Sequence, residues 1–364
     1  MRSLRHRRSD RTGHEMTVAA LIGAALAVVV ALLVIARGPA AAGADPPSCT
    51  RTGQLAYSVA KHSGERAMVW LANANGSDRR TLVRAAQPVL SPNGRMVAAT
   101  KFGGPGGLGL FTACGDLMSQ FFSSHDTVTG IAWSPDSTQL AAVVAQNANQ
   151  APFDERLDVI QVASGRVTTV ATGFLGGWGG PTFSPSSRQL AFANVPRVGR
   201  SPNIWTVTVG ERPVQLTRRG TNQYPVWGPR GLLYQHATRD GKTYLDRFTG
   251  GRSSTVMKLQ AWPVAVSKDG TRLAAESAAC GVVWPVSVNL ATRTVVHRFP
   301  PSFAPYGISP DGRSLLISGA RPAADCGGPR SIIATVPFSG GSPKLIAEGT
   351  DPSWADSRAA GIQP

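Results

Sequence analysis

The chain has 364 residues, enough for one large domain or two ordinary ones, and carries a net charge of +16. Six arginines against two acidic residues in residues 1–37 contribute +4, and the remaining basic residues are scattered without a run. We interpret this excess as compositional, because arginine far outnumbers lysine. The alternative is a domain that favours anionic wall polymers or lipid headgroups. Because the next segment of the chain predicts that this domain lies outside the cytoplasm, we expect no nucleic-acid partner.

Residues 17–36, TVAALIGAALAVVVALLVIA, carry no charge. A helix of this length extends about 30 Å, which is the thickness of the hydrocarbon core of a bilayer. Residues 1–16 form a basic tail that the positive-inside rule keeps in the cytoplasm. We therefore expect a single-pass protein of the cell membrane, with one N-terminal transmembrane helix and everything after it outside the cytoplasm.

A cleavable signal peptide is the alternative interpretation of this segment. The small residues of AGA at 42–44 form a candidate cleavage site, and cleavage after Ala44 would release a secreted protein. We favour the uncleaved anchor, because the apolar run is longer than the roughly 7–15 residues that a signal needs. Residues 37–49 are then a linker, and residues 50–364 are the exported domain.

The exported domain repeats a hairpin in which one apolar run leads into a tight turn and another follows. Proline fixes φ at the first central position of such a turn, and Asp or Asn followed by Gly tolerates the positive φ that a hairpin needs. The turns align at Ser91, Ser134, Ser184, Gly228, Ser267, Ser309 and Ala355. Their spacing of 39 to 50 residues is typical of a propeller or a solenoid.

A second hairpin follows each copy of the first, as in RLDVIQVASGRVTTVA from Arg156. Two hairpins make a four-stranded blade, so seven pairs predict an all-β, seven-bladed β-propeller, with six blades as the alternative. The stretch GQLAYSV from Gly53 looks like a second strand. We expect DPSWA, from Asp351, to supply the first strand of that blade and to close the ring by pairing the N- and C-terminal strands.

The repeat Ser-Pro-Asp-Gly-x-x-apolar-apolar is best preserved at 132–143, 182–193 and 307–317. It resembles the repeat of the TolB-like, WD-repeat-like propeller family, and the resemblance covers residues 50–364. It implies the fold and says little about function, because the repeat residues build the blades. The family's periplasmic member has six blades and a separate N-terminal domain, so its partners are not carried over to this chain.

Four cysteines in an exported domain suggest disulfides. If the strands of a blade are named a to d from the axis outward, the a–b and c–d turns share one face, which we call the turn face. The b–c loops and the connections between blades share the other, which we call the loop face. Cys49 and Cys114 fall on the turn face of adjacent blades, and Cys280 and Cys326 on the loop face of adjacent blades. We predict the disulfides Cys49–Cys114 and Cys280–Cys326.

The sequence offers no motif for catalysis or for a cofactor. It has no Cys-x-x-Cys, no His-Glu-x-x-His, no Gly-x-Ser-x-Gly and no glycine-rich phosphate loop that opens a helix. We therefore expect no metal and no cofactor, and we name no catalytic residue.

Aromatic residues recur in the connections that lead into the innermost strands. They are Trp178, Tyr224, Trp262, Phe303 and Tyr306. The topology places them on the loop face near the central channel, where they would stack on a sugar or anchor a partner peptide. Packing between blades is the alternative role.

These observations predict a monomeric, membrane-anchored propeller that binds or scaffolds an envelope protein or a cell-wall polymer. A propeller enzyme, either a hydrolase or a lyase acting on envelope glycans or esters, is the contrasting hypothesis, because propellers host both classes. Carboxylates or a metal at the channel mouth would favour the enzyme. An aromatic mouth without titratable groups would favour the binding module.

Overall fold

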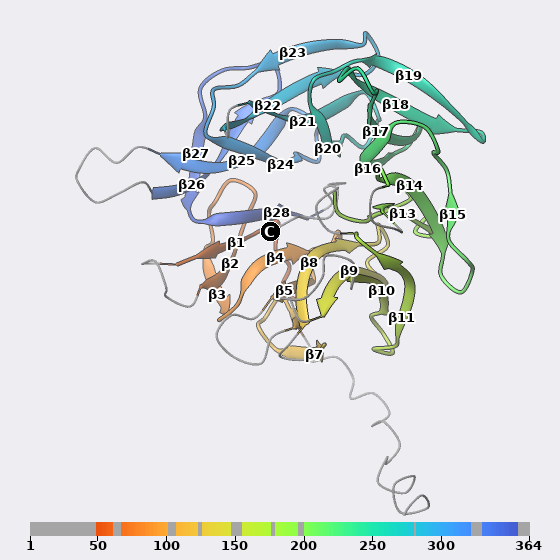
Figure 1. The fold of residues 1–364 in the computed structure, drawn as a ribbon. Coiled ribbons are helices and arrows are strands. Elements are labelled where there is room, and N and C mark those ends of the chain that lie inside the picture. The colour runs from red at the N-terminus through yellow and green to blue at the C-terminus, as the bar shows by residue number, and fades with distance from the viewer. Residues whose placement is uncertain are drawn as a thin grey trace, which may run out of the picture. The chain divides into compact units, whose positions relative to one another are not determined.

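The computed structural model describes residues 49–60, 67–100, 107–122, 126–146, 155–175, 179–195, 200–279, 282–321 and 330–355. These residues form seven four-stranded sheets in which all neighbouring strands are antiparallel. The sheets are the blades of a propeller (Figure 1). The prediction of an all-β, seven-bladed propeller is confirmed, and the six-bladed alternative is wrong.

The four strands of each blade follow one another from the innermost to the outermost. Blade one contains β28 (Thr350–Trp354), β1 (Leu55–Val59), β2 (Met68–Ala72) and β3 (Arg80–Val83); blade two contains β4 (Ala86–Leu90), β5 (Met96–Thr100), β6 (Leu108–Thr112) and β7 (Leu117–Phe121); blade three contains β8 (Asp126–Trp133), β9 (Gln139–Gln146), β10 (Glu155–Gln161) and β11 (Val167–Gly173). Blade four contains β12 (Thr182–Phe183), β13 (Gln189–Asn194), β14 (Asn203–Thr208) and β15 (Val214–Gln215); blade five contains β16 (Thr221–Gly228), β17 (Gly231–Ala237), β18 (Thr243–Thr249) and β19 (Arg252–Lys258). Blade six contains β20 (Trp262–Val266), β21 (Arg272–Ala279), β22 (Val282–Asn289) and β23 (Thr294–Arg298); blade seven contains β24 (Phe303–Ile308), β25 (Ser314–Arg321), β26 (Arg330–Pro337) and β27 (Lys344–Glu348).

The ring closes through blade one, whose strands come from both ends of the folded chain. The C-terminal strand β28 pairs antiparallel with β1, with Trp354 opposite Leu55 and Thr350 opposite Ser58. The innermost strands of successive blades are in contact around the whole circle, and β28 contacts both β24 and β4. The first and last strands therefore hold each other in one sheet, and no blade is left with an open inner edge.

The repeated turn is stabilised by its own side chains, which explains its sequence. In blade three, the Ser134 hydroxyl donates to Asp136 Oδ1 at 2.6 Å and accepts from the backbone N–H of Gln139 at 2.8 Å. The same two bonds recur in blade six, where Ser267 donates to Asp269 and accepts from Arg272 N–H. Each turn thus satisfies its backbone groups locally, and apolar side chains of the flanking strands are free to fill the space between blades.

The predicted Cys49–Cys114 disulfide is confirmed, with an S–S distance of 2.07 Å and a Cα–Cα distance of 5.9 Å. It joins the segment before β1 to the turn between β6 and β7. Cys280 and Cys326 lie outside the described residues. The expected transmembrane segment 17–36 also lies outside them, and within the described part of the chain no helix has the length and hydropathy to span a membrane.

Candidate binding site at the channel mouth

Four of the five predicted aromatic residues lie in three neighbouring innermost strands. Tyr224 is in β16, Trp262 begins β20, and Phe303 and Tyr306 are in β24. Trp178 lies outside the described residues. The structure stacks Tyr224 on Trp262, with ring centroids 5.3 Å apart and planes 20° from parallel. Blades five and six therefore present a joint aromatic surface at the start of β20, on the loop face.

The other two aromatics also pack between blades. Phe303 contacts the apolar cluster between blades six and seven, and it lies opposite Gly319 in the neighbouring strand β25. Tyr306 packs against the cluster that blades seven and one share. Packing between blades accounts for the position of Phe303. The ring of Tyr306 is packed in the same way, but its hydroxyl is also influenced by nearby charged groups.

Two carboxylates that no sequence motif singles out lie beside these rings. Glu276 in β21 is the direct cross-strand partner of Trp262, and burial raises the pKa of Glu276 to about 7. Burial also raises the pKa of Asp351 in β28, although a hydrogen bond with Thr350 opposes the shift. The pKa of Tyr306 is raised by burial and then by the negative charges of Asp351 and Glu276. The Tyr306 hydroxyl is therefore within electrostatic reach of both carboxylates.

Tyr224 completes this arrangement, because its pKa is raised by burial and by the charge of Glu276. We call Tyr224, Trp262, Glu276, Tyr306 and Asp351 the mouth cluster. Neither carboxylate of the cluster forms an ion pair with another described residue. The two negative charges are thus partly desolvated without a compensating cation, which is costly unless they are protonated or a ligand brings the cation.

The backbone at the mouth is strained in three of the innermost strands. Gln87, Tyr224 and Asp351 have φ angles of 47°, 55° and 51°, and each precedes a proline, which restricts it further. Left-handed residues other than glycine cost on the order of 1–3 kcal/mol and concentrate at functional sites. Gly179 backs directly onto Tyr224, because a Cβ atom there would lie 2.6 Å from Tyr224 Cα. Local bulges thus interrupt the regular alternation of side chains between the two faces of these strands and change the direction of the mouth side chains.

The cluster holds too few ligands for a metal site of ordinary composition. Among the described residues, no group of three or more His, Cys, Asp and Glu side chains is close enough to hold a metal ion. What the cluster offers is two carboxylates and three aromatic rings. This combination suits a cationic group, which aromatic faces and carboxylates both attract.

Comparisons with known proteins identify solved structures with a similar fold. No family profile and no curated protein matches the chain. Two solved structures with a similar fold are TolB from Acinetobacter baumannii and oligogalacturonate lyase from Vibrio parahaemolyticus. The TolB match has 16% sequence identity and a TM-score of 0.51, and it covers 83% of this chain and 66% of that chain. The lyase match has 12% sequence identity and a TM-score of 0.58, and it covers 76% of this chain and 85% of that chain. A puromycin-hydrolyzing peptidase from Mycobacterium tuberculosis matches at 15%, TM-score 0.56, over 82% of this chain and 54% of that one.

The chain thus spans about two thirds of this TolB and about half of the peptidase. The matched proteins differ in function, and at identities this low the likeness concerns the fold. The described residues of this chain form a seven-bladed β-propeller, and its fold is similar to that of TolB.

Proposed function

We propose that the protein is a membrane-anchored, extracytoplasmic binding module whose mouth cluster captures a cationic group of an envelope protein or cell-wall polymer. The observation that carries this proposal is the pair of partly buried carboxylates, Glu276 and Asp351, set among Trp262, Tyr224 and Tyr306 without a basic partner. A lysine, an amino sugar or a free amino terminus would supply the missing charge. Its carbon stem would lie on the Tyr224–Trp262 surface.

The basic composition of the chain restricts where a cationic ligand can bind. With a net charge of +16, the protein as a whole repels cations. A cationic ligand that binds must therefore find a local acidic site. Most of the other described acidic side chains are already engaged, as Asp158 is with Arg156, at 2.8 Å, and Asp240 is with Lys242, at 2.6 Å.

The test uses the full-length chain in detergent and a fluorescent tetralysine peptide as the probe. We expect the wild type to bind this peptide, and Asp351→Asn or Trp262→Ala to weaken binding about tenfold, the loss of roughly one charge-assisted or cation–π contact. The matched control is Glu211→Gln, an exposed acid in the turn between β14 and β15, which should bind as the wild type does. Equal loss in the control, or no binding by the wild type, would refute the cation site.

A second candidate function is an enzyme, and the carboxylates at the channel mouth favour it, as expected from the sequence for an enzyme. Binding is proposed first because both carboxylates lack a basic partner among the described residues. Glu276 has a pKa raised to about 7 by burial, which suits a general acid or base at neutral pH, and the charge of a second carboxylate, Asp351, also raises the pKa of Tyr306. The fold match to oligogalacturonate lyase adds an example of an enzyme with a similar fold. Release of reducing ends from envelope glycans by the wild type, lost in Glu276→Gln with the protein still folded, would favour this candidate over the binding module.

A further inference from the structure

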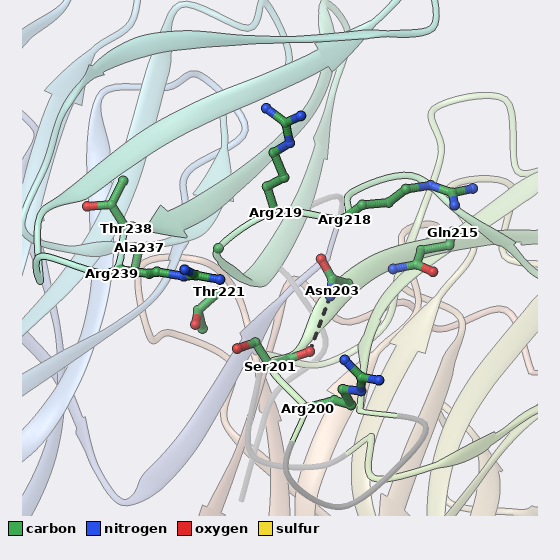
Figure 2. Close-up of a pocket in the computed structure, with 11 residues that line it drawn as sticks. Arg200, Ser201, Asn203, Gln215, Arg218, Arg219, Thr221, Ala237, Thr238 and Arg239 are labelled. Carbon is green, nitrogen blue, oxygen red and sulfur yellow. Dashed lines mark hydrogen bonds between the residues drawn. The ribbon is translucent and has the colours of Figure 1, made fainter.

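A second site lies on the loop face, between blades four and five, and its charge is opposite to that of the mouth cluster. A cavity of about 810 Å³ opens there, lined by the loop before β14, the connection from β15 to β16 and the loop after β17. Four arginines line it, Arg200, Arg218, Arg219 and Arg239, and none of the described residues that line it is acidic (Figure 2). We call these four side chains the arginine pocket.

The four arginines come from three separate loops, and Figure 2 shows them on different sides of the cavity. All four are exposed, and within the described residues none of them forms an ion pair. The nearest acid in sequence, Asp240, is held by Lys242 at 2.6 Å and by the Thr238 hydroxyl. The Asp240 carboxylate is therefore already paired with Lys242 and Thr238, and the guanidinium groups keep their capacity to bind an anion.

The loops that carry the arginines are fixed by a buried polar network. The Asn222 side chain, 2% exposed, donates to the carbonyl of Arg219 at 2.8 Å and to Asn203 Oδ1 at 3.1 Å. The Thr217 hydroxyl donates to the same Asn203 oxygen at 3.1 Å and accepts from Ile204 N–H at 2.9 Å. The backbone of the connection from β15 to β16 is thus tied to blade four on both sides of Arg218 and Arg219.

Gly220 brings this connection against blade five. Its φ is 72°, and a Cβ atom there would lie 2.6 Å from His236 Nε2 and 2.7 Å from the carbonyl of Ala237. Only glycine permits this approach. It places Arg218 and Arg219 beside the loop that bears Arg239, so the backbone brings these arginines to one cavity.

We propose that the arginine pocket binds a phosphate group of a sugar phosphate or a polyol phosphate, free or within a polymer. Guanidinium groups pair with phosphate bidentately, and a phosphomonoester offers three oxygens and nearly two charges to the surrounding donors. The hydroxyls of Ser201 and Thr221 line the same cavity and add neutral donors for the sugar or for remaining oxygens. The volume is that of a small-ligand site, well above what a bare ion needs.

The test is calorimetry on the full-length chain at low ionic strength in a buffer without phosphate. The probes are glucose 6-phosphate, glucuronate, glucose and an oligomer of glycerol phosphate. We expect glucose 6-phosphate to bind at least about tenfold more tightly than glucuronate, with glucose not bound and with affinity falling as salt rises. A larger affinity per phosphate for the oligomer would identify a polymer as the source, and equal affinity would identify a small molecule.

The decisive variant is the triple substitution R200Q/R218Q/R239Q, and its matched control is R166Q/R188Q/R252Q. The control removes the same charge from exposed arginines on the opposite face, where Arg166 and Arg188 lie in turns and Arg252 begins β19. We expect the first variant to lose binding by about tenfold or more and the control to bind as the wild type does, with both unfolding at the wild-type temperature. Equal losses in the two variants, equal affinity for glucuronate, or no phosphate binding by the wild type would overturn the proposal.

Discussion

Replacing Cys49 and Cys114 together by alanine is expected to lower the free energy of unfolding by up to about 4 kcal/mol, because the bridge closes a long loop in the unfolded chain. The two cysteines are 65 residues apart in sequence. The bridge also fastens the segment before β1 to blade two, while β1 itself completes the sheet that β28 closes. Loss of the bridge therefore loosens the blade on which ring closure depends.

The measurement is denaturant unfolding of the full-length chain without reductant, comparing the wild type with C49A/C114A. The wild type treated with reductant should match the double variant if no other disulfide stabilises the protein. A further decrease on reduction would report the second predicted bridge, and C280A/C326A would then lose that additional amount. Coinciding midpoints for the wild type and C49A/C114A in the absence of reductant would contradict the prediction.

The fold was predictable because its signals are local. The bonds from Ser134 to Asp136 and Gln139 lie within six consecutive residues, so the sequence alone predicts the turn. The turn recurs once per blade, and this spacing predicts a propeller. The Cys49–Cys114 disulfide was predictable once the propeller topology was inferred, because that topology assigns each turn to one of the two faces. Element order alone was enough for that inference.

The candidate sites depend on contacts between blades, and these are not visible in a single sequence. Tyr224 and Trp262 were singled out by position, but their stacking required the structure. No pattern in the sequence indicates Glu276 or Asp351, because they lie in strands of different blades and their joint effect on the pKa of Tyr306 depends on the folded ring. The arginines scattered along the sequence likewise include four that the loops of blades four and five gather around one cavity. The interpretation of the charge as purely compositional does not explain that gathering.

Glu276→Gln is expected to stabilise the protein by about 2 kcal/mol at pH 8, after allowance for screening by solvent. Burial raises the pKa of Glu276 from 4.5 to about 7. Between these values the folded state holds a proton that the unfolded state has released, so the stability of the wild type falls as pH rises through this window. Glutamine does not titrate, so the variant lacks this decrease and gains nothing below about pH 4.5.

The measurement is the free energy of unfolding of the two proteins at intervals from about pH 4 to about pH 8.5, which brackets the window in which Glu276 titrates. Asp351 shifts in the same direction, so E276Q/D351N should show a still flatter profile, whereas the exposed control Glu211→Gln should keep the wild-type slope. Parallel profiles for the wild type and Glu276→Gln would show that this carboxylate is well solvated. That result would remove the acid–base argument for an enzyme.

The same titration separates the two candidate functions of the mouth cluster. A bound cation favours the charged form of Glu276, so a tetralysine probe should bind more tightly at about pH 8 than at about pH 6 and should release protons on binding. At high pH the charged Glu276 lowers the free energy of unfolding of the unliganded protein, and a bound cation offsets this loss. An acid–base catalyst instead needs Glu276 to exchange its proton near pH 7, so its turnover would depend on pH around that value even where substrate binding does not.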